Sequence, residues 1–565
     1  MTDATDATRA LTPDEARRAD AAAPEGPVLA ADGTPLKRSL NRALRLQKLR
    51  ALALIAPLLI FVLITFIAPI ADMLFRSVEN QIVSETLPRT TDLLADWDAT
   101  SDTPPPEPVF EALYQDMFIA KEAKLHTRLG SRLNYELTGV SSLFRKSGRK
   151  VDDMGEVYQD QFEDLNKFWK DGENWNAMMG SEDWQSDMTA WDPKSDDPQP
   201  SFELRDGISD VLPETAEKFQ IYADFIQNVD EDNLAKEDPW AIVYSALYDD
   251  LSDVDAAALS SLQAPGSAEL QEATAAVGSF ESVNYTEAFA DADEDWLDLD
   301  VWRTIQTYSP KYTSGYFLNA VDMQKGIDGA EMRPENEQIY LKLFWRTIVM
   351  SLTITISCIL LGYPVAWILA NLPARTANLL MILVLLPFWT SLLVRTSAWK
   401  VMLQQQGVIN DTLVWLGIVA DDGRLALINN QTGTIIAMTH ILLPFMILPL
   451  YSVMQTIQPT YLRAAKSLGA TNWTAFWRVY FPQSIPGIGA GSILVFILSI
   501  GYYITPEIVG GTSGIFISNR IAYHISQSLN WGLGAALGAI LLAAVMLLYY
   551  AYDKIVGIDN VKLGG

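Results

Sequence analysis

An acidic side chain close to two aromatic rings could bind an organic cation near the end of an apolar segment. Glu507 follows Pro506 in the apolar segment 487–509, and Tyr502 and Tyr503 come shortly before it. Because an ionisable residue at the centre of a bilayer costs about 2.5–3.5 kcal/mol on insertion scales, Glu507 is a candidate functional residue. A carboxylate beside aromatic rings suits an ammonium group. The alternative is that Glu507 faces water at the membrane surface or pairs with Arg395.

Two further residues in the apolar segment 379–403 allow a similar pair of interpretations. Trp389 and Arg395 can line a solute pathway, or they can serve as a belt residue and a helix-end anchor at the membrane surface. If Arg395 does line the pathway, it argues against a purely cationic solute or holds Glu507 in place. His440 stands alone in another apolar segment, which favours a packing role.

The sequence offers no group of residues for catalysis or for a metal. It contains no glycine-rich loop ending in Gly-Lys-Ser/Thr, so we expect no nucleotide at a P-loop. Three histidines and the single Cys358 are widely separated, which predicts neither a metal site nor a disulfide. Because no Ser/His/Asp or Cys/His arrangement is present either, the sequence predicts a chain that is not an enzyme and binds no cofactor. No basic, aromatic-laced patch indicates nucleic-acid binding.

A polar, basic stretch at residues 458–484 separates two strongly apolar segments. Its pattern predicts a short helix over Tyr461–Leu468, ended by Gly469. A second helix over Asn472–Tyr480 is expected to begin after an N-cap at Thr471 or Asn472 and to stop before Pro482. We call this stretch the hairpin. An ordered hairpin between two membrane spans indicates a docking site, although an ordinary amphipathic interfacial loop is the simpler alternative.

The hairpin resembles the coupling loop of binding-protein-dependent ABC importers, whose pattern is Glu-Ala-Ala, three residues, Gly, and then a helix ending in Pro. The matching residues are Ala464, Ala465, Gly469, Phe476, Val479 and Pro482. The position of the family's Glu is occupied by Arg463, so a salt bridge from that position to the ATPase is absent or reversed here. The resemblance implies that a partner ATPase contacts Arg463, Ala464, Ala465, Lys466, Gly469, Phe476 and Pro482.

A narrower resemblance, to permeases of the spermidine/putrescine type, covers the first apolar segment and residues 344–550. The residues that carry it are Gly362–Trp367, Leu386–Thr390 with Arg395, Leu442–Tyr451 and Gly501–Gly511. It implies a six-helix subunit that works with a second permease, a dimer of ATPase subunits that hold ATP and Mg²⁺, and a periplasmic solute-binding protein. Such permeases normally join their first two spans by a short loop, so residues 78–340 lie outside the resemblance.

Six apolar segments are long enough to cross a bilayer. They are 51–75, 344–371, 379–403, 433–457, 487–509 and 531–551. Basic residues precede the first segment at 37–50 and follow the second, fourth and sixth, at Arg375, in the hairpin, and at Lys554 and Lys562. By the positive-inside rule, both termini and the hairpin are then cytoplasmic and residues 78–340 are periplasmic. Prolines inside these segments predict kinks that serve either packing or gating.

Residues 78–340, which we call the insert, carry most of the negative charge. Of the chain's 69 acidic residues 55 lie here, with 19 of the 41 basic residues, so the insert is near −36 and the remainder near +8. Eight tryptophans and helix-like spacing predict a folded, mostly helical unit. It could dock the binding protein or concentrate cationic solute near the pore. The simpler alternative is a folded decoration whose charge keeps it soluble.

Taken together, these patterns predict an all-α polytopic membrane protein with six transmembrane helices. The expected regions are a disordered cytoplasmic tail (1–36), a basic flank with the first span (37–77), the insert (78–340) and a permease core (341–565). The expected function is ATP-driven import of polyamines across the bacterial inner membrane. Alternatives are another solute, such as an opine, an amino-acid derivative, thiamine or iron, or a membrane-anchored receptor or scaffold.

Overall fold

The computed structural model describes residues 36–192, 198–254, 259, 262, 264–326 and 329–556. The predicted tail lies, apart from its last residue, outside the described residues, as does Lys562. The chain divides into two compact units, Met1–Met73 and Leu74–Gly565, which are described separately.

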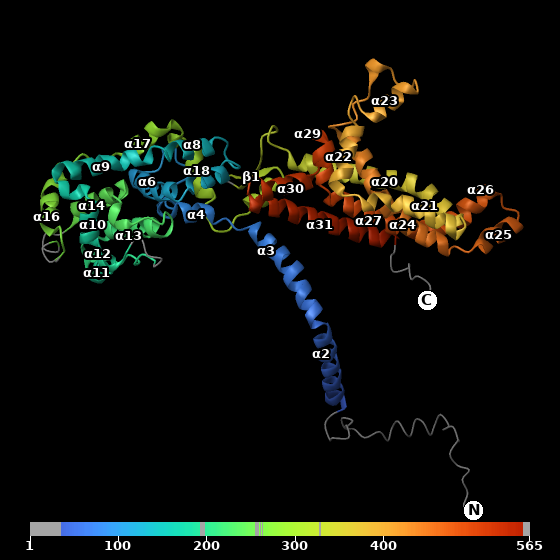
Figure 1. Ribbon diagram of the computed structural model, residues 1–565, viewed down its shortest axis with the longest axis horizontal. Coiled ribbons are helices and arrows are strands. Elements are labelled where there is room, and N and C mark those ends of the chain that lie inside the picture. The colour runs from blue at the N-terminus through green and yellow to red at the C-terminus, as the bar shows by residue number, and fades with distance from the viewer. Residues whose placement is uncertain are drawn as a thin grey trace, which may run out of the picture. The chain divides into compact units, whose positions relative to one another are not determined.

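The first unit is built around one long helical stretch, coloured blue in Figure 1. It contains α2 (Leu36–Val62), a π-helical turn η1 (Leu63–Ile67) and the start of α3 (Ala68–Arg76). The 30 residues Gln47–Arg76 have a mean hydropathy of 2.9, which suits a membrane span. Their side chains are exposed, as expected for a helix surrounded by lipid. This stretch contains the predicted first span.

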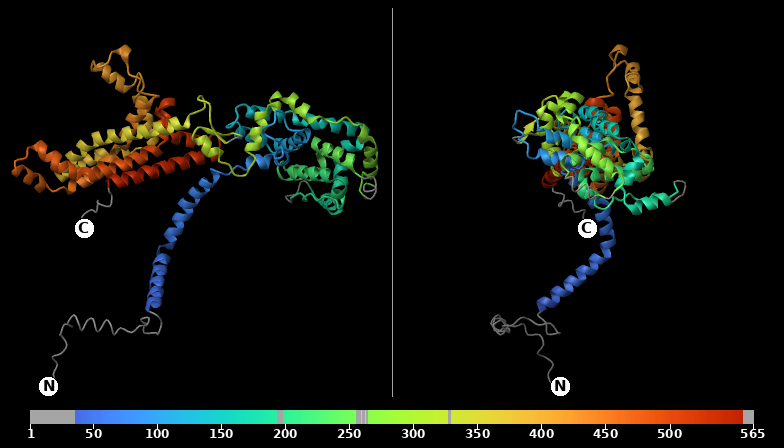
Figure 2. Two further views of the ribbon diagram at one scale, coloured as in Figure 1. Left: turned by 180° about the vertical axis from the view of Figure 1, so that it is seen from behind. Right: turned by 90° about the vertical axis from the view of Figure 1, so that its left-hand side faces the viewer.

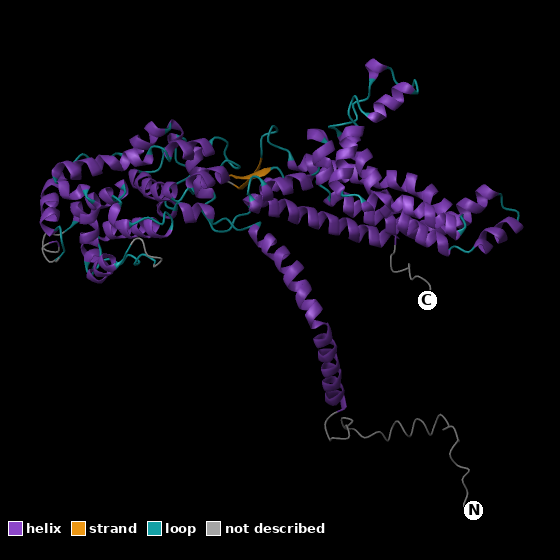
Figure 3. Cartoon of the chain, in the orientation of Figure 1, coloured by secondary structure: helices purple, strands orange, loops and turns teal. Residues whose placement is uncertain are grey.

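In the second unit the insert is helical, as its spacing predicted, with one small antiparallel β-hairpin (Figure 3). The strands β1 (Met323–Gly326) and β2 (Gly329–Met332) pair Met323 with Met332. The helices are α4 (Ile82–Thr86), α5 (Pro88–Leu94), α6 (Glu107–Glu122), α7 (His126–Leu133), α8 (Val140–Ser147), α9 (Val151–Leu165), η2 (Lys167–Lys170), α10 (Gly172–Met179), α11 (Glu182–Ala190), α12 (Ile208–Val211), α13 (Pro213–Asn228), η3 (Leu234–Lys236), α14 (Ala241–Asp253), α16 (Ser267–Ala276), η4 (Val277–Ser279), α17 (Tyr285–Ala292), η5 (Glu294–Leu297), α18 (Leu299–Thr307) and α19 (Gly315–Ala320).

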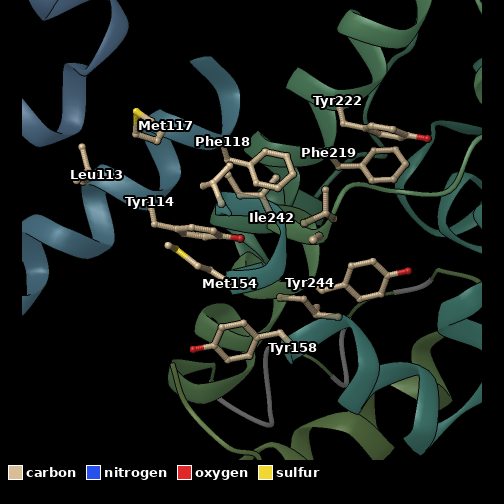
Figure 4. Packing of buried hydrophobic residues seen from close by; sticks show 14 of the residues in the cluster. Leu113, Tyr114, Met117, Phe118, Met154, Tyr158, Phe219, Tyr222, Ile242 and Tyr244 are labelled. Carbon is tan, nitrogen blue, oxygen red and sulfur yellow. The ribbon is translucent and has the colours of Figure 1, made fainter. Parts of the chain in front are cut away.

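The insert has an aromatic-rich core of its own, part of which is shown in Figure 4. Trp169, Trp175, Trp296 and Trp302 are fully buried. The indole of Trp175 donates to the carbonyl of Trp169 at 2.9 Å, and that of Trp302 to the carbonyl of Trp296 at 2.8 Å. Since buried indole N–H groups that find acceptors avoid a desolvation penalty, Trp175 and Trp302 stabilise a defined fold.

The permease core is formed by long apolar helices that pack around α24 (Gln431–Thr456). Helices α20 (Tyr340–Asn371) and α27 (Phe481–Gly501) pack against α24 and against each other, and all three contribute to one buried cluster. The remaining elements are α21 (Ala374–Leu385), η6 (Leu386–Trp389), α22 (Leu392–Met402), α23 (Val408–Trp415), η7 (Asp421–Gly423), α25 (Pro459–Ser467), α26 (Asn472–Ala475), η8 (Phe476–Tyr480), α28 (Ile504–Val509), α29 (Gly511–Gly514), α30 (Ile517–Ser526) and α31 (Trp531–Val556).

The described residues contain five helices that are long and apolar enough to span a membrane, or six if one bent pair counts as a span. That pair occupies the segment 379–403, which we predicted as one helix. Instead, Ala374–Trp389 and Leu392–Met402 meet at 94°. Pro387 lacks a backbone donor, and Ser391 starts a new helix by accepting a hydrogen bond from the Val394 amide at 3.2 Å. The prediction of a continuous third helix was therefore wrong.

The predicted span 487–509 also ends earlier than expected, at Gly501. Tyr502 is extended, and α28 begins separately at Ile504. The Ser518 hydroxyl lies 2.9 Å from the Ile500 carbonyl and 3.1 Å from the Tyr502 carbonyl, so the groups freed at the break have a donor. Apolar composition alone did not reveal this break.

Asp322 connects the insert to the start of α20 through hydrogen bonds. Its side chain is buried, with the residue 1% exposed. One carboxylate oxygen accepts from the amides of Ile339 at 3.0 Å and Tyr340 at 2.8 Å, and the other from Leu341 at 2.8 Å. The first turn of a helix leaves these amides without partners, so Asp322 caps α20.

We expect Asp322→Ala to lower the free energy of unfolding by about 2 kcal/mol, at the upper end for a lost helix cap. Asp322 has φ +59°, a left-handed conformation that asparagine tolerates well. Asp322→Asn keeps an acceptor there and is the matched control. Thermal unfolding of the purified full-length chain in detergent measures both, and equal midpoints for the two variants would contradict the capping role.

A neutral histidine lies close to the same junction. His524 is 3% exposed; its Nε2 lies 3.0 Å from the Tyr340 hydroxyl and its Nδ1 3.0 Å from the Ser528 hydroxyl. Burial, and secondarily the charge of Arg520, lowers the pKa of His524 to about 4. The imidazole is therefore uncharged near neutral pH and links α20 to α30 by hydrogen bonds.

Candidate functional site

The hairpin is ordered, and its turn has the geometry that the sequence predicted. After α25, Gly469 adopts φ +90°. The amide of Ala470 donates to the Ala465 carbonyl at 3.1 Å, and that of Gly469 to the Lys466 carbonyl at 3.0 Å. This pattern is a left-handed helix terminator, which glycine adopts without strain. The Thr471 hydroxyl then caps α26 by accepting from the Thr474 amide at 3.2 Å.

We had predicted that the second helix of the hairpin stops before Pro482, but the helix continues through this residue. Instead α26, the π-helical turn η8 and α27 form one stretch, Asn472–Gly501. A proline lacks the N–H of the helical ladder and its ring crowds the preceding turn. The π-helical turn over Phe476–Tyr480 lies directly before Pro482 and alters the hydrogen-bond spacing there, so the helix continues.

The outer surface of the hairpin is exposed and basic. Leu468 is 90% exposed, and Arg463, Ala464, Lys466 and Gly469 are also exposed. No ion pair of Arg463 or Lys466 is present in the described part of the chain. Small, exposed residues beside two cations, with the apolar Leu468 at the tip, form a surface that a partner groove can accept.

The inner side of the hairpin is anchored to the core by aromatic rings. Phe476 is half-buried and meets the ring of Tyr363 on α20 edge-on, with centroids 6.2 Å apart. The Tyr363 hydroxyl lies 3.0 Å from that of Ser484 on α27. Sequence reasoning placed Phe476 at the partner surface and gave Tyr363 no role here. The structure places the Phe476 ring against α20.

Arg395 lies at the break between η6 and α22. Its guanidinium donates to the Thr390 carbonyl at 3.0 Å and to the carbonyl of Pro387. A helix break inside a membrane frees carbonyl groups that water does not reach, so an internal donor stabilises it. Arg395 is therefore held at the break by backbone carbonyls of its own segment.

Glu507 is exposed at the start of α28 and is hydrogen-bonded to Asn519 rather than paired with Arg395. The Asn519 amide lies 2.6 Å from the Glu507 carboxylate and 2.9 Å from the Tyr503 carbonyl. The carboxylate is therefore fixed in position but accessible. A fixed, accessible carboxylate can bind an ammonium group.

The other pathway candidates lie on neighbouring elements. Tyr503 is exposed and Tyr502 half-buried, both just before Glu507, and the buried hydroxyls of Thr396 and Thr505 lie 3.1 Å apart and link α22 to α28. Trp389 lies at the end of η6 and is 74% exposed. The contact between Thr396 and Thr505 thus brings the helix that carries Arg395 beside the helix that carries Glu507.

One pair that sequence reasoning missed is formed by Trp399 and His440. The Trp399 indole donates to His440 Nδ1 at 3.1 Å, and the two rings meet edge-on at 5.2 Å. We had given His440 a packing role because it stands alone in its apolar segment. The partner is 41 positions away in the sequence, and no local pattern connects the two residues.

Among the described residues, no three His, Cys, Asp or Glu side chains are grouped in a way that could hold a metal ion. Cys358 is buried, and its thiol lies 3.6 Å from the Thr439 carbonyl.

Comparison with known proteins identifies the core. The family described as binding-protein-dependent transport system inner membrane component matches residues 340–557, so the match begins where the insert ends. The spermidine/putrescine transport system permease protein PotB of Haemophilus influenzae is 36% identical over 220 residues, which cover 38% of this chain and 76% of that protein.

Two further relatives match about the same length of this chain. PotB of Salmonella typhimurium is 34% identical over 222 residues, covering 39% of this chain and 77% of that protein. The inner membrane ABC transporter permease protein YdcU of Escherichia coli is 32% identical over 238 residues, covering 40% and 74%. The chain therefore belongs to the binding-protein-dependent transport system inner membrane components, as a multi-pass permease of the spermidine/putrescine type.

Proposed function

We propose that this permease subunit imports a polyamine, or a closely related organic polyammonium solute, in an ATP-driven ABC importer. The observation that carries the proposal is the 34–36% identity to spermidine/putrescine permeases across three quarters of their length. The accessible carboxylate of Glu507 beside Tyr503 adds a group that suits such a solute.

ATP hydrolysis belongs to a separate subunit in this proposal, because the chain has no P-loop. Closure of the ATPase dimer moves the hairpin, and the contact between Phe476 and Tyr363 passes the movement to α20. Arg463 replaces the acidic residue of the family pattern. We therefore expect the ATPase surface facing Arg463 to be acidic or neutral. A basic surface there would contradict this placement of the hairpin on the ATPase.

The proposed membrane topology follows from the basic loops. The hairpin is cytoplasmic, and the insert is periplasmic, where a solute-binding protein delivers the solute. A second permease subunit covers apolar faces that the core leaves exposed. Examples are Leu379, Ile382 and Leu383 on α21, each 47–62% exposed.

We expect Glu507→Gln to raise the KM for a polyammonium solute about tenfold, since it removes one charge pair worth roughly 1–2 kcal/mol. Glutamine keeps an acceptor for Asn519, so the local geometry is retained. Asp422→Asn, an exposed acid in the loop between α23 and α24, is the matched control. Uptake of labelled spermidine by proteoliposomes containing all subunits measures both, and unchanged kinetics for Glu507→Gln would reject the charge-pairing role.

The alternatives differ either in the solute or in the whole class of function. An opine, an amino-acid derivative, thiamine or iron would use the same hairpin, whereas a membrane-anchored receptor would need only one of the spans. Ligand binding to the cognate solute-binding protein tests the solute class. Nanomolar to micromolar binding of spermidine or putrescine supports the proposal, and selective binding of an uncharged or anionic solute overturns it.

A further inference from the structure

A cavity of about 510 Å³ lies where the insert meets the ends of two membrane-facing helices. All of its lining residues belong to the second unit. Its walls come from the end of α3, from α4 and α7 of the insert, and from the turn before α31. The charged and amide side chains that line it include Arg76, Arg128, Arg132, Glu79, Glu85 and Asn530. The transport mechanism described above uses none of them.

Two buried donors in the cavity wall have no acceptor among the described residues. Arg132 is 6% exposed; its Nε donates to the Tyr316 hydroxyl at 2.9 Å and its Nη1 to Glu136 at 2.8 Å, but its Nη2 is unpartnered. Asn530 is 7% exposed, and its Nδ2 is also unpartnered. Since an unpaired buried donor costs about 1–3 kcal/mol, the wall favours a ligand that brings an acceptor.

The cavity also presents charges of both signs at its exposed rim. Arg128 is exposed and makes no ion pair in the described part of the chain, and Glu85 is exposed on the opposing helix α4. Arginine side chains recognise phosphate through several donors, and a carboxylate recognises an ammonium group. A ligand that carries a phosphate and an ammonium group a few bonds apart would use both.

Two apolar stretches that suit membrane spans have one end each at the cavity. Arg76 is the last residue of the apolar stretch Gln47–Arg76, and Trp531 is the first residue of the apolar helix Trp531–Lys554. The guanidinium of Arg76 lies 5.9 Å from the ring centre of Trp531. Tryptophan is enriched at the membrane–water interface, and Leu529 beside it is 62% exposed, next to where acyl chains would begin.

We propose that this cavity binds the headgroup of a zwitterionic aminophospholipid. The phosphate lies against Arg128 and the donors of Arg132 and Asn530, the ammonium group lies near Glu85, and the acyl chains leave along Leu529 and Trp531. The bound lipid then occupies the junction between the insert and the core. The proposal does not depend on which solute the permease transports.

The test uses the delipidated full-length chain in detergent, with phosphatidylethanolamine, phosphatidylglycerol or soluble glycerophosphoethanolamine added. Native mass spectrometry measures the apparent Kd for each. We expect Arg128→Gln to weaken binding of both lipids about tenfold, because one charge-assisted contact is lost. Glu85→Gln should weaken binding of phosphatidylethanolamine only, since phosphatidylglycerol has no ammonium group. Arg149→Gln, an exposed arginine outside the cavity, is the matched control.

Three results would overturn the proposal. The first is equal lipid binding by Arg128→Gln and Arg149→Gln. The second is an equal effect of Glu85→Gln on the binding of both lipids, which would show that Glu85 does not contact an ammonium group. The third is binding of soluble glycerophosphoethanolamine as tight as that of the lipid, which would identify a soluble phosphate compound as the ligand. Arg128 and Glu85 are both exposed, so neither variant is expected to impair folding.

Discussion

Replacing Gly469 with valine is expected to reduce solute-stimulated ATP hydrolysis about tenfold in the reconstituted importer. Gly469 has φ +90°, and a built Cβ there meets no atom within 4 Å, so the effect comes from the backbone and not from a clash. A β-branched residue in the left-handed region costs at least about 1–2 kcal/mol. The turn that orients α25 against α26 would then change, and with it the surface offered to the ATPase.

Two controls separate coupling from general destabilisation. Gly417 has φ +70° and equally free surroundings, but it lies in the loop before α24, at the other end of that helix from the hairpin. Gly417→Val should therefore leave stimulation unchanged. Gly469→Asn should retain most of it, because asparagine adopts the left-handed conformation more readily than valine. Normal solute-stimulated ATP hydrolysis in Gly469→Val would contradict a role of the hairpin in coupling.

Replacing Glu136 with alanine is expected to destabilise the insert by about 3–5 kcal/mol. The carboxylate of Glu136 is 3% exposed and lies 2.8 Å from both Arg132 and Arg333. It also accepts a hydrogen bond from the Tyr308 hydroxyl at 3.0 Å. Without it, two buried guanidinium groups lose their shared counter-ion. Arg333 keeps Glu337 at 3.3 Å, but the desolvation cost of Arg132 is no longer offset by a carboxylate.

Chemical unfolding of the full-length chain, followed by the fluorescence of the buried tryptophans, measures this loss. Glu182→Ala is the matched control, because the Glu182 side chain is 89% exposed and lies 3.7 Å from its partner Arg205. A long ion pair whose carboxylate is almost fully solvated contributes at most about 1 kcal/mol. Equal unfolding midpoints for the Glu136 and Glu182 variants would show that the buried network does not stabilise the insert.

Much of the architecture could be predicted because hydropathy and glycine chemistry act locally. The lengths of the apolar segments place α20, α24 and α31 close to their observed positions, and the hairpin turn follows from Gly469 and Thr471 alone. The number of tryptophans and the helix-like spacing indicated a folded, mostly helical insert, and the insert has a buried aromatic core.

Two features of the membrane helices could not be read from composition. The break at Pro387 depends on Arg395, eight residues later, donating to the carbonyls that the break frees. The continuity of the helix through Pro482 depends on the π-helical turn before it. In both places a proline permits two outcomes, and contacts that form only in the folded chain decide between them.

The candidate site was predicted in its residue types but not in its contacts. Glu507 was identified by its charge in an apolar segment, whereas its partner Asn519 lies on α30. Tyr363 and Phe476 are 113 positions apart in the sequence. They come together only when α20 packs beside the start of α27. Long-range pairs of this kind leave no periodic signal.

Site-specific crosslinking from the tip of the hairpin tests the central claim most directly. A photoreactive residue at Leu468, which is 90% exposed, should crosslink in membranes to a subunit that carries a Gly-Lys-Ser/Thr nucleotide loop. The same residue at Trp415, which is 83% exposed near the opposite end of α24, should not. Crosslinks to an ATPase from position 415, or none from position 468, would contradict the assignment of the hairpin as the coupling element.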